Sequence, residues 1–215
     1  MKHKILLIGA GGHAKSVIET IDLNKFEIVG IIDADQDHIH QKVNGIEIID
    51  CDKNLETYYP YKAVCAFVAI GHVGNYEIRN TIYCQLEKIG YQLVNIIHEK
   101  AIIATSVNMG EGNLIMPLAV INPDSSLGNN NIINTGAIIE HDVHIGSGVH
   151  LAPGTVICGG STVYDNAFIG AGTTIIQGIS IGANSIIGAG SVVISDIPEN
   201  VVALGSPARI IKRRK

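Results

Sequence analysis

Three polar residues, Glu140, His141 and Asp142, interrupt an otherwise apolar pattern in the C-terminal half of the chain. A histidine beside carboxylates is suited to act as a general base, because a carboxylate can hold one tautomer of the imidazole. An unperturbed imidazole, with a pKa of about 6.5, is mostly neutral at pH 7, as a base must be. The alternative interpretation is a solvated polar turn. The pattern therefore makes His141 a candidate base.

A second chemically suggestive segment, at 9–14, reads Gly-Ala-Gly-Gly-His-Ala and lies between a short apolar run and a helical pattern. Glycines in such a turn allow the backbone to approach a phosphate at a helix N-terminus. Asp33, roughly 20 residues further on at the end of the next apolar run, has the position of an acid that accepts from a ribose hydroxyl or a base N–H. The turn predicts a nucleotide site at Gly11, Gly12, His13 and Asp33; a tight turn without a ligand is the alternative.

Gly71 and Arg79 extend the predicted nucleotide site, since Gly71 ends another apolar run and Arg79 lies in the helical segment that follows. The chain before residue 97 has about 95 residues, which is room for one mononucleotide-binding half. NAD is the obvious ligand for such a turn, but a nucleotide attached to a sugar fits this size better.

Alternating strands and helices position these residues in the N-terminal part. Short apolar runs predict strands, and helical spacing predicts crossover helices, so that the expected arrangement is a small parallel, Rossmann-like α/β sheet. The strands are expected at 4–8, 28–33, 45–49, 63–70 and 91–97, and the helices at 14–22 and 76–89.

From Ile97 the period changes to six. Every sixth residue from Ile97 to Val193 is aliphatic or Met, without a slip of the frame, and small or β-branched residues dominate four positions later. This hexapeptide pattern predicts a parallel β-helix in which three hexads close one coil. The aliphatic residues should point inward, and the chain should leave the repeat at Pro198.

Three hexads per coil place Gly159 directly above His141, so that the Gly159 N–H could face a developing oxyanion. His150 lies half a coil beyond His141, where it is either a surface histidine or a group that reaches the site of a neighbouring subunit. Cys158 is also near His141 and is an alternative nucleophile, although a small residue in a crowded turn is the simpler interpretation.

Composition excludes several classes of function. The net charge is −5 and the pI about 6.0, and basic residues cluster only in the last four positions, which argues against nucleic-acid binding. The four cysteines show no C-x-x-C spacing and predict free thiols in a reducing compartment. No signal peptide or long apolar run is present, so we expect a cytoplasmic protein. The spacing of the histidines, His141, His144 and His150, does not match a zinc pattern, and no metal is expected.

The chain resembles the bacterial sugar acyltransferases of the bacillosamine-pathway N-acetyltransferase and sialic-acid O-acetyltransferase-like type. The residues that carry the likeness are Gly-Gly-His-Ala-Lys at 11–15, Ala-Ile-Gly at 69–71, Glu-Ile-Arg at 77–79, Asn-Ile-Ile-His at 95–98, Asn-Thr at 134–135, Ile-Glu-His-Asp at 139–142, His150, and Gly-Ser-Pro-Ala-Arg at 205–209.

The resemblance implies a left-handed β-helix and two domains, a nucleotide-sugar domain at 1–96 and an acyltransferase domain at 97–215. It implies a homotrimer that transfers acetyl from acetyl-CoA to the 4-amino group of a UDP- or dTDP-linked 4-amino-4,6-dideoxy sugar for surface glycans. Sialic acid O-acetylation, a non-catalytic nucleotide-sugar scaffold and hydride transfer are the alternatives.

The same resemblance assigns roles to residues. His141 is the general base, Asp142 orients it, and the Gly159 N–H meets the oxyanion. The acetyl-CoA contacts implied are His150 from the adjacent subunit, Asn134, Gly159, and the segment of Gly205, Ser206, Pro207 and Ala208. The nucleotide-sugar contacts implied are Gly11, Gly12, His13 and Asp33.

Overall fold

The computed structural model describes residues 2–214, which form two compact units. The first unit extends through Gly71 and resumes at Glu77–His98, and the second contains the segment His72–Tyr76 together with the chain from Glu99 onward. Within the described residues, no helix is both long and apolar enough to cross a membrane. The division assigns the short connection His72–Tyr76 to the C-terminal unit, a placement that the repeat pattern does not reveal.

The first unit is an α/β sheet with strand order β3-β4-β2-β1-β5-β6. All of its pairings are parallel except the β3–β4 hairpin. Its strands are β1 (His3–Ile8), β2 (Phe26–Asp33), β3 (Lys42–Val43), β4 (Ile46–Cys51), β5 (Cys65–Val68) and β6 (Gln92–Leu93), and β7 (Ile96–Ile97) follows near its end. Its helices are α1 (Gly12–Thr20), α2 (Leu55–Tyr58) and α3 (Glu77–Ile89), with 3-10 turns η1 (Gln36–His38) and η2 (Asp52–Asn54).

These elements confirm the predicted order of strands and helices, with shifted ends. Helix α1 begins two residues earlier than expected because Gly11, with extended backbone angles, is already its N-cap. Strand β5 is shorter than the predicted run at both ends, although the Ala69 N–H still donates to the Ile8 carbonyl of β1 at 2.7 Å. The short elements η1, η2, β3 and α2 were not predicted, since none is long enough to show a period.

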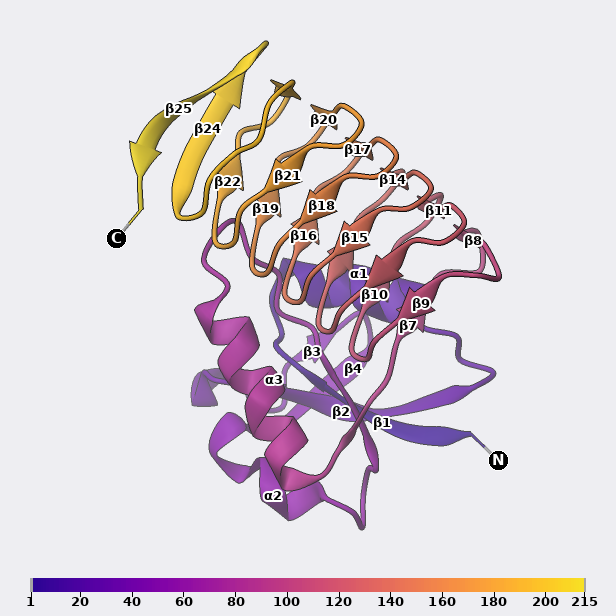
Figure 1. The fold of residues 1–215 in the computed structure, drawn as a ribbon. Helices are drawn as coiled ribbons and strands as arrows, with labels where there is room; N and C mark the ends of the chain where they lie inside the picture. Colours follow the sequence, from indigo (N-terminus) through magenta and orange to yellow (C-terminus); the bar gives the residue numbers. More distant parts are fainter. Residues whose placement is uncertain (1, 215) are drawn as a thin grey trace. The chain divides into compact units, whose positions relative to one another are not determined.

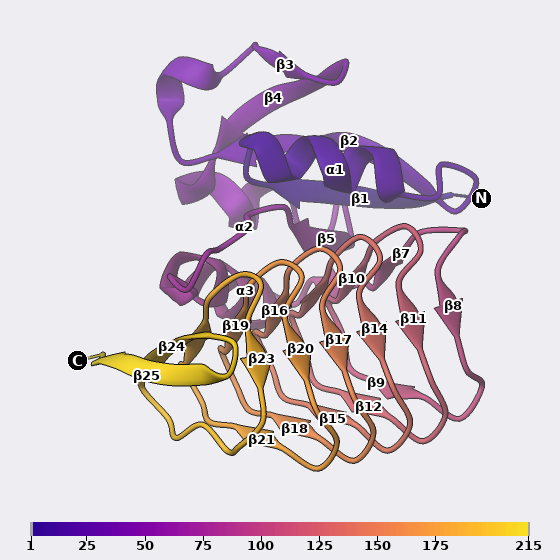
Figure 2. The same ribbon diagram turned by 90° about the horizontal axis from the view of Figure 1, so that it is seen from above.

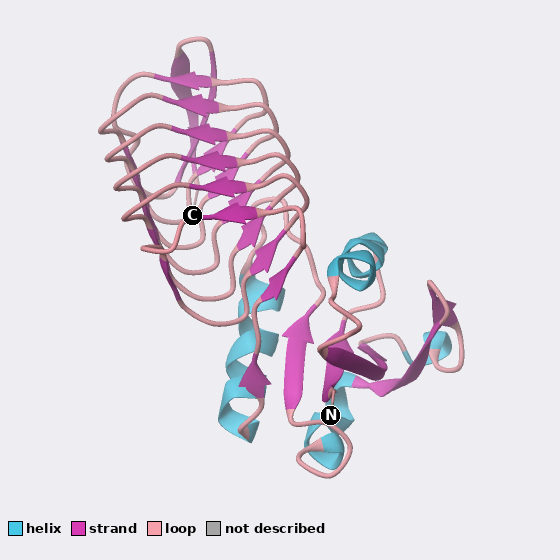
Figure 3. Cartoon of the chain, turned by 90° about the vertical axis from the view of Figure 1, so that its right-hand side faces the viewer, coloured by secondary structure: helices cyan, strands magenta, loops and turns pink. Residues whose placement is uncertain are grey.

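The second unit is a left-handed parallel β-helix, built from two-residue strands separated by tight turns (Figures 1 and 3). Equivalent strands of successive coils, three hexads apart, pair in parallel, for example Ile139 with Ile157. The row of β8, β11, β14, β17, β20 and β23 is seen in Figure 2.

The strands form three ladders. The first contains β10 (Leu114–Ile115), β13 (Ile132–Ile133), β16 (His150–Leu151), β19 (Phe168–Ile169) and β22 (Ile186–Ile187). The second contains β8 (Ile102–Ile103), β11 (Val120–Ile121), β14 (Ile138–Ile139), β17 (Val156–Ile157), β20 (Thr174–Ile175) and β23 (Val192–Val193). The third contains β9 (Asn108–Met109), β12 (Ser126–Leu127), β15 (His144–Ile145), β18 (Thr162–Val163) and β21 (Ser180–Ile181).

The second residue of each short strand is the predicted inward position. From Ile115 to Val193 these side chains are buried in one continuous core, which confirms the hexapeptide interpretation. The first members differ: Ile97 is 41% exposed, and Ile103 and Met109 are only partly buried, because no earlier coil covers them. The small residues four positions later fill the corners, where buried hydroxyls such as Ser161 Oγ donate to a carbonyl of the next coil.

A left-handed backbone conformation recurs every sixth residue from Gly112 to Gly190, three positions after each inward residue. Most of these positions hold Gly, Asn or Asp, the residue types that tolerate positive φ. Asp142 is one of them, with φ 58. The turn geometry therefore contributes to the choice of residue at 142, independently of any chemistry.

The β-helix ends through a shortened coil. Ile197 pairs with Ile181, and Ala203 pairs with Ile187, so that each of these steps falls short of three full hexads. The strict repeat therefore ends after Val193, earlier than the predicted exit at Pro198, although Ile197 still packs into the core. The chain then forms an antiparallel hairpin of β24 (Val201–Gly205) and β25 (Ala208–Arg213), which the repeat pattern did not predict.

Candidate active site and nucleotide pocket

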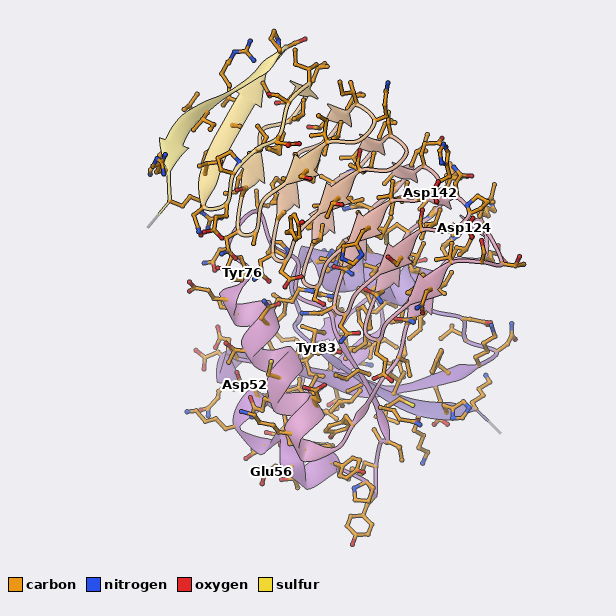
Figure 4. The ribbon with its side chains drawn as sticks, viewed as in Figure 1. Asp52, Glu56, Tyr76, Tyr83, Asp124 and Asp142 are labelled. Atoms are coloured by element: carbon orange, nitrogen blue, oxygen red, sulfur yellow. The ribbon has the colours of Figure 1, made fainter. Side chains whose placement is uncertain are left out.

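The Glu-His-Asp segment forms the turn between β14 and β15, on the outside of the β-helix. His141 Nδ1 lies 2.8 Å from Asp142 Oδ2, and both side chains are 65% exposed. Figure 4 shows Asp142 at the same edge of the β-helix as Asp124, which occupies the equivalent turn one coil earlier. When Nδ1–H donates to the carboxylate, Nε2 is left as the basic nitrogen facing solvent.

The two neighbouring acids change the basicity of this histidine. The hydrogen bond to the Asp142 carboxylate raises the pKa of His141 above its ordinary value, and the negative charges of Asp142 and Glu140 act in the same direction. The sequence-based expectation of an unperturbed pKa is therefore wrong. The free chain protonates His141 at a higher pH than a solvated imidazole, so the neutral base needs a more alkaline medium.

Gly159 lies against the imidazole, as the spacing of three hexads predicts. A methyl group placed on Gly159 Cα would be 2.7 Å from His141 Cε1 and 2.8 Å from Nε2. Within residues 2–214, no hydrogen bond uses the Gly159 N–H, whereas the Gly160 N–H donates to the His141 carbonyl at 3.0 Å. The structure thus brings together a basic nitrogen, a bare glycine and a free N–H.

His150 lies elsewhere on the β-helix, on a different ladder from β14 and β15. It is only 8% exposed, so the interpretation as a surface histidine is wrong. His150 Nδ1–H donates to the His72 carbonyl at 2.6 Å, and Asn134 Nδ2 donates to His150 Nε2 at 3.2 Å. Its ring also packs edge-on against His72 and Phe168. The predicted acetyl-CoA residues Asn134 and His150 are therefore hydrogen-bonded neighbours.

The connection His72–Tyr76 was not recognised in the sequence as part of this neighbourhood. Besides the His72 carbonyl, it offers the Gly74 carbonyl, to which Arg214 Nη2 donates at 2.7 Å. A side chain at Gly74 would overlap with Ile186. The only sequence signal was the glycine itself, which permits this close approach.

The Gly-Ser-Pro-Ala segment forms the turn of the terminal hairpin. Gly205 adopts φ 109, and its N–H donates to Ser191 Oγ at 3.1 Å. Ser206 and Pro207 are exposed at the tip, while Ala208 is buried against the end of the core. Of the acetyl-CoA contacts expected in this segment, the geometry leaves Ser206 and Pro207 accessible.

The first unit contains a pocket of about 430 Å³ at the carboxyl ends of its strands. The pocket is lined by Ile8, Gly9, Ala10, Gly11, Gly12, His13, Asp33, Ala34, Asp52, Ala69, Ile70, Gly71, Ile78 and Ile82. The N-terminus of α1 opens into it without a side-chain cap, and a side chain at Gly11 or Gly12 would meet no atom within 4 Å. An uncapped helix N-terminus with open space before it suits an anion such as a diphosphate.

Asp33 has a structural task in addition to its place in the pocket. Its Oδ2 accepts from the Ala10 N–H at 2.7 Å, which ties the glycine-rich turn to the end of β2. Its Oδ1 accepts from the Asp35 N–H and lies 3.1 Å from His38 Nδ1. The carboxylate is thus oriented before any ligand arrives.

The predicted residues Gly71 and His13 are neighbours in the lining of the pocket, where a side chain on Gly71 would be 3.1 Å from the His13 ring. Arg79 does not line the pocket. It is 1% exposed, and its Nη1 donates to the carbonyls of Val68 and Ile70 at 2.6 and 2.7 Å. Burial lowers the pKa of Arg79 to about 9. The expectation of a direct ligand contact is corrected: Arg79 positions the chain after β5.

Several lining residues were missed in the sequence. Ile78 and Ile82 belong to α3, and their helical spacing indicated a buried face rather than a pocket wall. Asp52 follows β4 directly, at a strand end whose position the sequence did not fix accurately. A carboxylate just after a parallel strand was the available signal.

The candidate histidines for a metal site are dispersed. His144 lies on β15, where its Nδ1 is 2.9 Å from Ser126 Oγ, and His150 is buried on another ladder. Among the described residues, no three His, Cys, Asp or Glu side chains are grouped to hold a metal ion.

Comparisons with known proteins identify both units. Residues 4–86 match the PglD N-terminal domain, and residues 124–159 and 160–195 match the bacterial transferase hexapeptide (six repeats). A PglD-type N-terminal unit followed by a left-handed hexapeptide β-helix places the chain in the class of hexapeptide-repeat transferases.

Solved structures place the chain more narrowly. Perosamine N-acetyltransferase from Caulobacter crescentus, determined with CoA and GDP-perosamine, is 38% identical over 97% of both chains with a TM-score of 0.90. A variant of it in which a histidine is replaced by asparagine superposes equally well. The acetyltransferase domain of PglB from Neisseria gonorrhoeae, solved also with acetyl coenzyme A, is 31% identical with a TM-score of 0.89, over 98% of this chain and 100% of that domain.

This chain belongs to the family of bacterial sugar N-acetyltransferases represented by these enzymes. Among curated proteins it matches an uncharacterized protein of Acanthamoeba polyphaga mimivirus, 33% identical over 111 residues. That match covers 52% of this chain, and the chain spans about a fifth of the length of the viral protein.

Proposed function

We propose that this protein transfers the acetyl group of acetyl-CoA to the amino group of a nucleotide-linked amino sugar. The observation that carries the proposal is the His141 imidazole, held by Asp142 at 2.8 Å and resting on Gly159. The Caulobacter relative, solved with CoA and GDP-perosamine, supports both substrates. The sequence favoured UDP or dTDP, and the relative adds GDP to the candidate nucleotides.

In the proposed mechanism, the sugar amine attacks the carbonyl carbon of the thioester. His141 Nε2 accepts a proton from the amine, and the Asp142 carboxylate stabilises the imidazolium that results. The Gly159 N–H donates to the oxyanion of the tetrahedral intermediate. The C–S bond then breaks, and the thiolate of CoA takes the proton from His141 to leave as the thiol.

The nucleotide part of the substrate is assigned to the pocket of the first unit. The uncapped N-terminus of α1, with Gly11, Gly12 and His13, receives the diphosphate, and Asp33 accepts from the ribose. Gly71 lines the pocket beside His13, and Arg79 holds the chain at this point through the Ile70 carbonyl. We therefore propose that the nucleotide-sugar domain predicted at 1–96 binds the nucleotide and that the acyltransferase domain predicted at 97–215 carries the acetyl transfer.

We infer a homotrimer. The outward residues of the β14 ladder are mostly apolar, and Ile102, at its start, is 65% exposed. The outward residues of the β15 ladder are polar by contrast, with Ser126, His144 and Thr162 among them. An apolar face next to the His141 turn suits packing against a second copy, which would supply Asn134, His150 and the 205–208 turn to the acetyl-CoA site. A cytoplasmic location belongs to the same proposal, because both substrates are metabolites of that compartment and the four cysteines are free.

The rival functions predict different measurements. A sialic acid O-acetyltransferase would release CoA thiol with free sialic acid and not with nucleotide sugars. A binding scaffold would bind nucleotide without releasing thiol, and a hydride-transfer enzyme would bind NAD. The pair His141–Asp142 serves acyl transfer and disfavours the scaffold and the hydride-transfer enzyme. The relative solved with GDP-perosamine favours an amino sugar over sialic acid.

The test is thiol release from acetyl-CoA with a panel of GDP-, UDP- and dTDP-linked 4-amino sugars. We expect turnover with at least one member, and we expect His141→Ala to reduce it about 10²- to 10⁴-fold, the usual contribution of a positioned general base. Folding should be preserved because His141 is an exposed turn residue. Near-wild-type turnover of His141→Ala would show that the base lies elsewhere.

A further inference from the structure

The pocket of the first unit follows the carboxyl ends of three neighbouring strands. Strand β1 pairs with β2, and β2 pairs with β4, all in parallel. The glycine-rich turn follows β1, Asp33 ends β2, and Asp52 comes directly after Cys51, the residue of β4 that pairs with Asp33. Because neighbouring strands lie about 4.8 Å apart, these three groups are spaced in steps of about 5 Å along one edge.

A nucleoside diphosphate has its parts in the same order. The uncapped N-terminus of α1 takes the diphosphate, and the acid at the end of the next strand takes the ribose. The base then extends one strand further, to the end of β4. The polar group of the pocket at this position is the Asp52 carboxylate.

The carboxylate of Asp52 is available to a ligand, whereas that of its neighbour Asp50 is engaged in hydrogen bonds. Asp50 accepts from the Cys51 N–H, from Asn54 Nδ2 and from the Tyr58 hydroxyl, and so holds η2 and α2 to the end of β4. Among the described residues, no hydrogen bond or ion pair occupies the partly exposed Asp52 carboxylate. Figure 4 labels Asp52, the first residue of η2, and Glu56, which follows in α2.

A carboxylate discriminates among the bases because it only accepts hydrogen bonds. Guanine presents two adjacent donors, N1–H and the 2-amino group, which match the two oxygens of one carboxylate. Uracil and thymine present a single N3–H between two carbonyl oxygens, which would repel the second carboxylate oxygen. Adenine and cytosine present an amino group beside a ring nitrogen, and this nitrogen is a hydrogen-bond acceptor that would repel the second carboxylate oxygen.

We propose that Asp52 recognises guanine, so that the nucleotide part of the substrate is guanosine diphosphate. This inference rests on the proposed function, of which it specifies the substrate, and it replaces the UDP or dTDP expected from the sequence.

Calorimetry with free nucleoside diphosphates tests the assignment. Wild type should bind GDP more tightly than UDP, dTDP or inosine diphosphate. The last of these lacks only the 2-amino group and should bind about tenfold to hundredfold more weakly, the effect of one hydrogen bond to a charged partner. The variant Asp52→Asn should lose a similar factor for GDP and gain affinity for xanthosine diphosphate, because the amide donates to the 2-oxo group of xanthine and accepts from N1–H.

A matched control is Asp37→Asn, which removes an exposed carboxylate that does not line the pocket and should leave the nucleotide preference unchanged. Equal binding of GDP and inosine diphosphate by wild type, or no gain for xanthosine diphosphate in Asp52→Asn, would overturn the assignment. If wild type binds UDP or dTDP best and acetylates the corresponding sugar, the guanine assignment fails while the acetyltransferase proposal stands. If no nucleotide sugar supports thiol release, the proposed function itself fails.

Discussion

Replacement of Gly159 by alanine tests the candidate active site more sharply than removal of the histidine, because it leaves every polar group in place. The new methyl would lie 2.7 Å from His141 Cε1 and 2.8 Å from Nε2, whereas ordinary contacts start at about 3.4 Å. The imidazole is exposed and can swing away, so we expect a displacement of about 1 Å rather than unfolding. A misplacement of about 1 Å at a reacting group can reduce the rate about 10²-fold.

The assay is thiol release under kcat/KM conditions, with the melting temperature measured on the same samples. Gly159→Ala should lower kcat/KM about 10²-fold with little change in melting temperature. Combined with His141→Ala it should cause no further loss, because the two changes act on one group.

The adjacent glycine provides the control. Gly160 adopts φ 67, and a side chain there would meet no atom within 4 Å. Gly160→Ala should therefore destabilise the fold by ~1 kcal/mol through backbone strain and leave kcat/KM unchanged. Full activity of Gly159→Ala, or an equal loss of activity in Gly160→Ala, would refute the hypothesis that catalysis depends on the packing of the His141 imidazole on Gly159.

Three further predictions concern the base, the nucleotide and the assembly. The hydrogen bond to Asp142 is the largest cause of the raised pKa of His141, so Asp142→Asn should lower that pKa. The acidic limb of the profile of log kcat/KM against pH should then move to lower pH, and the plateau should fall. A limb that does not move would show that it reports the titration of a group other than His141. Asparagine suits the left-handed backbone at 142, so the melting temperature should hold. Asp33→Ala should weaken nucleotide binding by ~1–3 kcal/mol, through the lost acceptor and the released Ala10 N–H, without changing acetyl-CoA binding; calorimetry with each ligand checks this, and a loss confined to acetyl-CoA would contradict it. Val156→Arg, on the apolar outer ladder, should convert a trimer into 22.8 kDa monomers by light scattering, whereas Thr162→Arg on the polar ladder should not; a wild type that is already monomeric would exclude the trimer.

The β-helix could be predicted from the sequence because its period is carried by single residue types. One aliphatic residue in six determines the inward direction, so that the pairing of Ile139 with Ile157 follows from counting along the chain. The same arithmetic brought Gly159 next to His141. Contacts between residues that the repeat does not relate could not be predicted, among them the hydrogen bond from His150 to the distant His72 carbonyl.

The burial and the pKa of a side chain were harder to predict than the place of its residue in the fold. Arg79 was expected at the nucleotide site because it lies in the helical segment after Gly71, but its burial beneath β5 depends on how α3 packs on the sheet. The basicity of His141 depended on whether Asp142 turned toward the ring or toward solvent. Such choices are made by packing and local geometry, which the sequence states only indirectly.

The equal spacing of the turns makes the length of the β-helix independent of its chemistry. Insertion or loss of a whole coil at either end would return every following residue to the same face, so that such events are compatible with an unchanged site. Insertion of a single hexad before Glu140 would rotate the histidine by one third of a revolution, away from the apolar ladder beside which it now lies. Evolution of this architecture should therefore proceed by steps of whole coils. The turn that carries His141 would then keep its face of the β-helix, while its distance from either end could change.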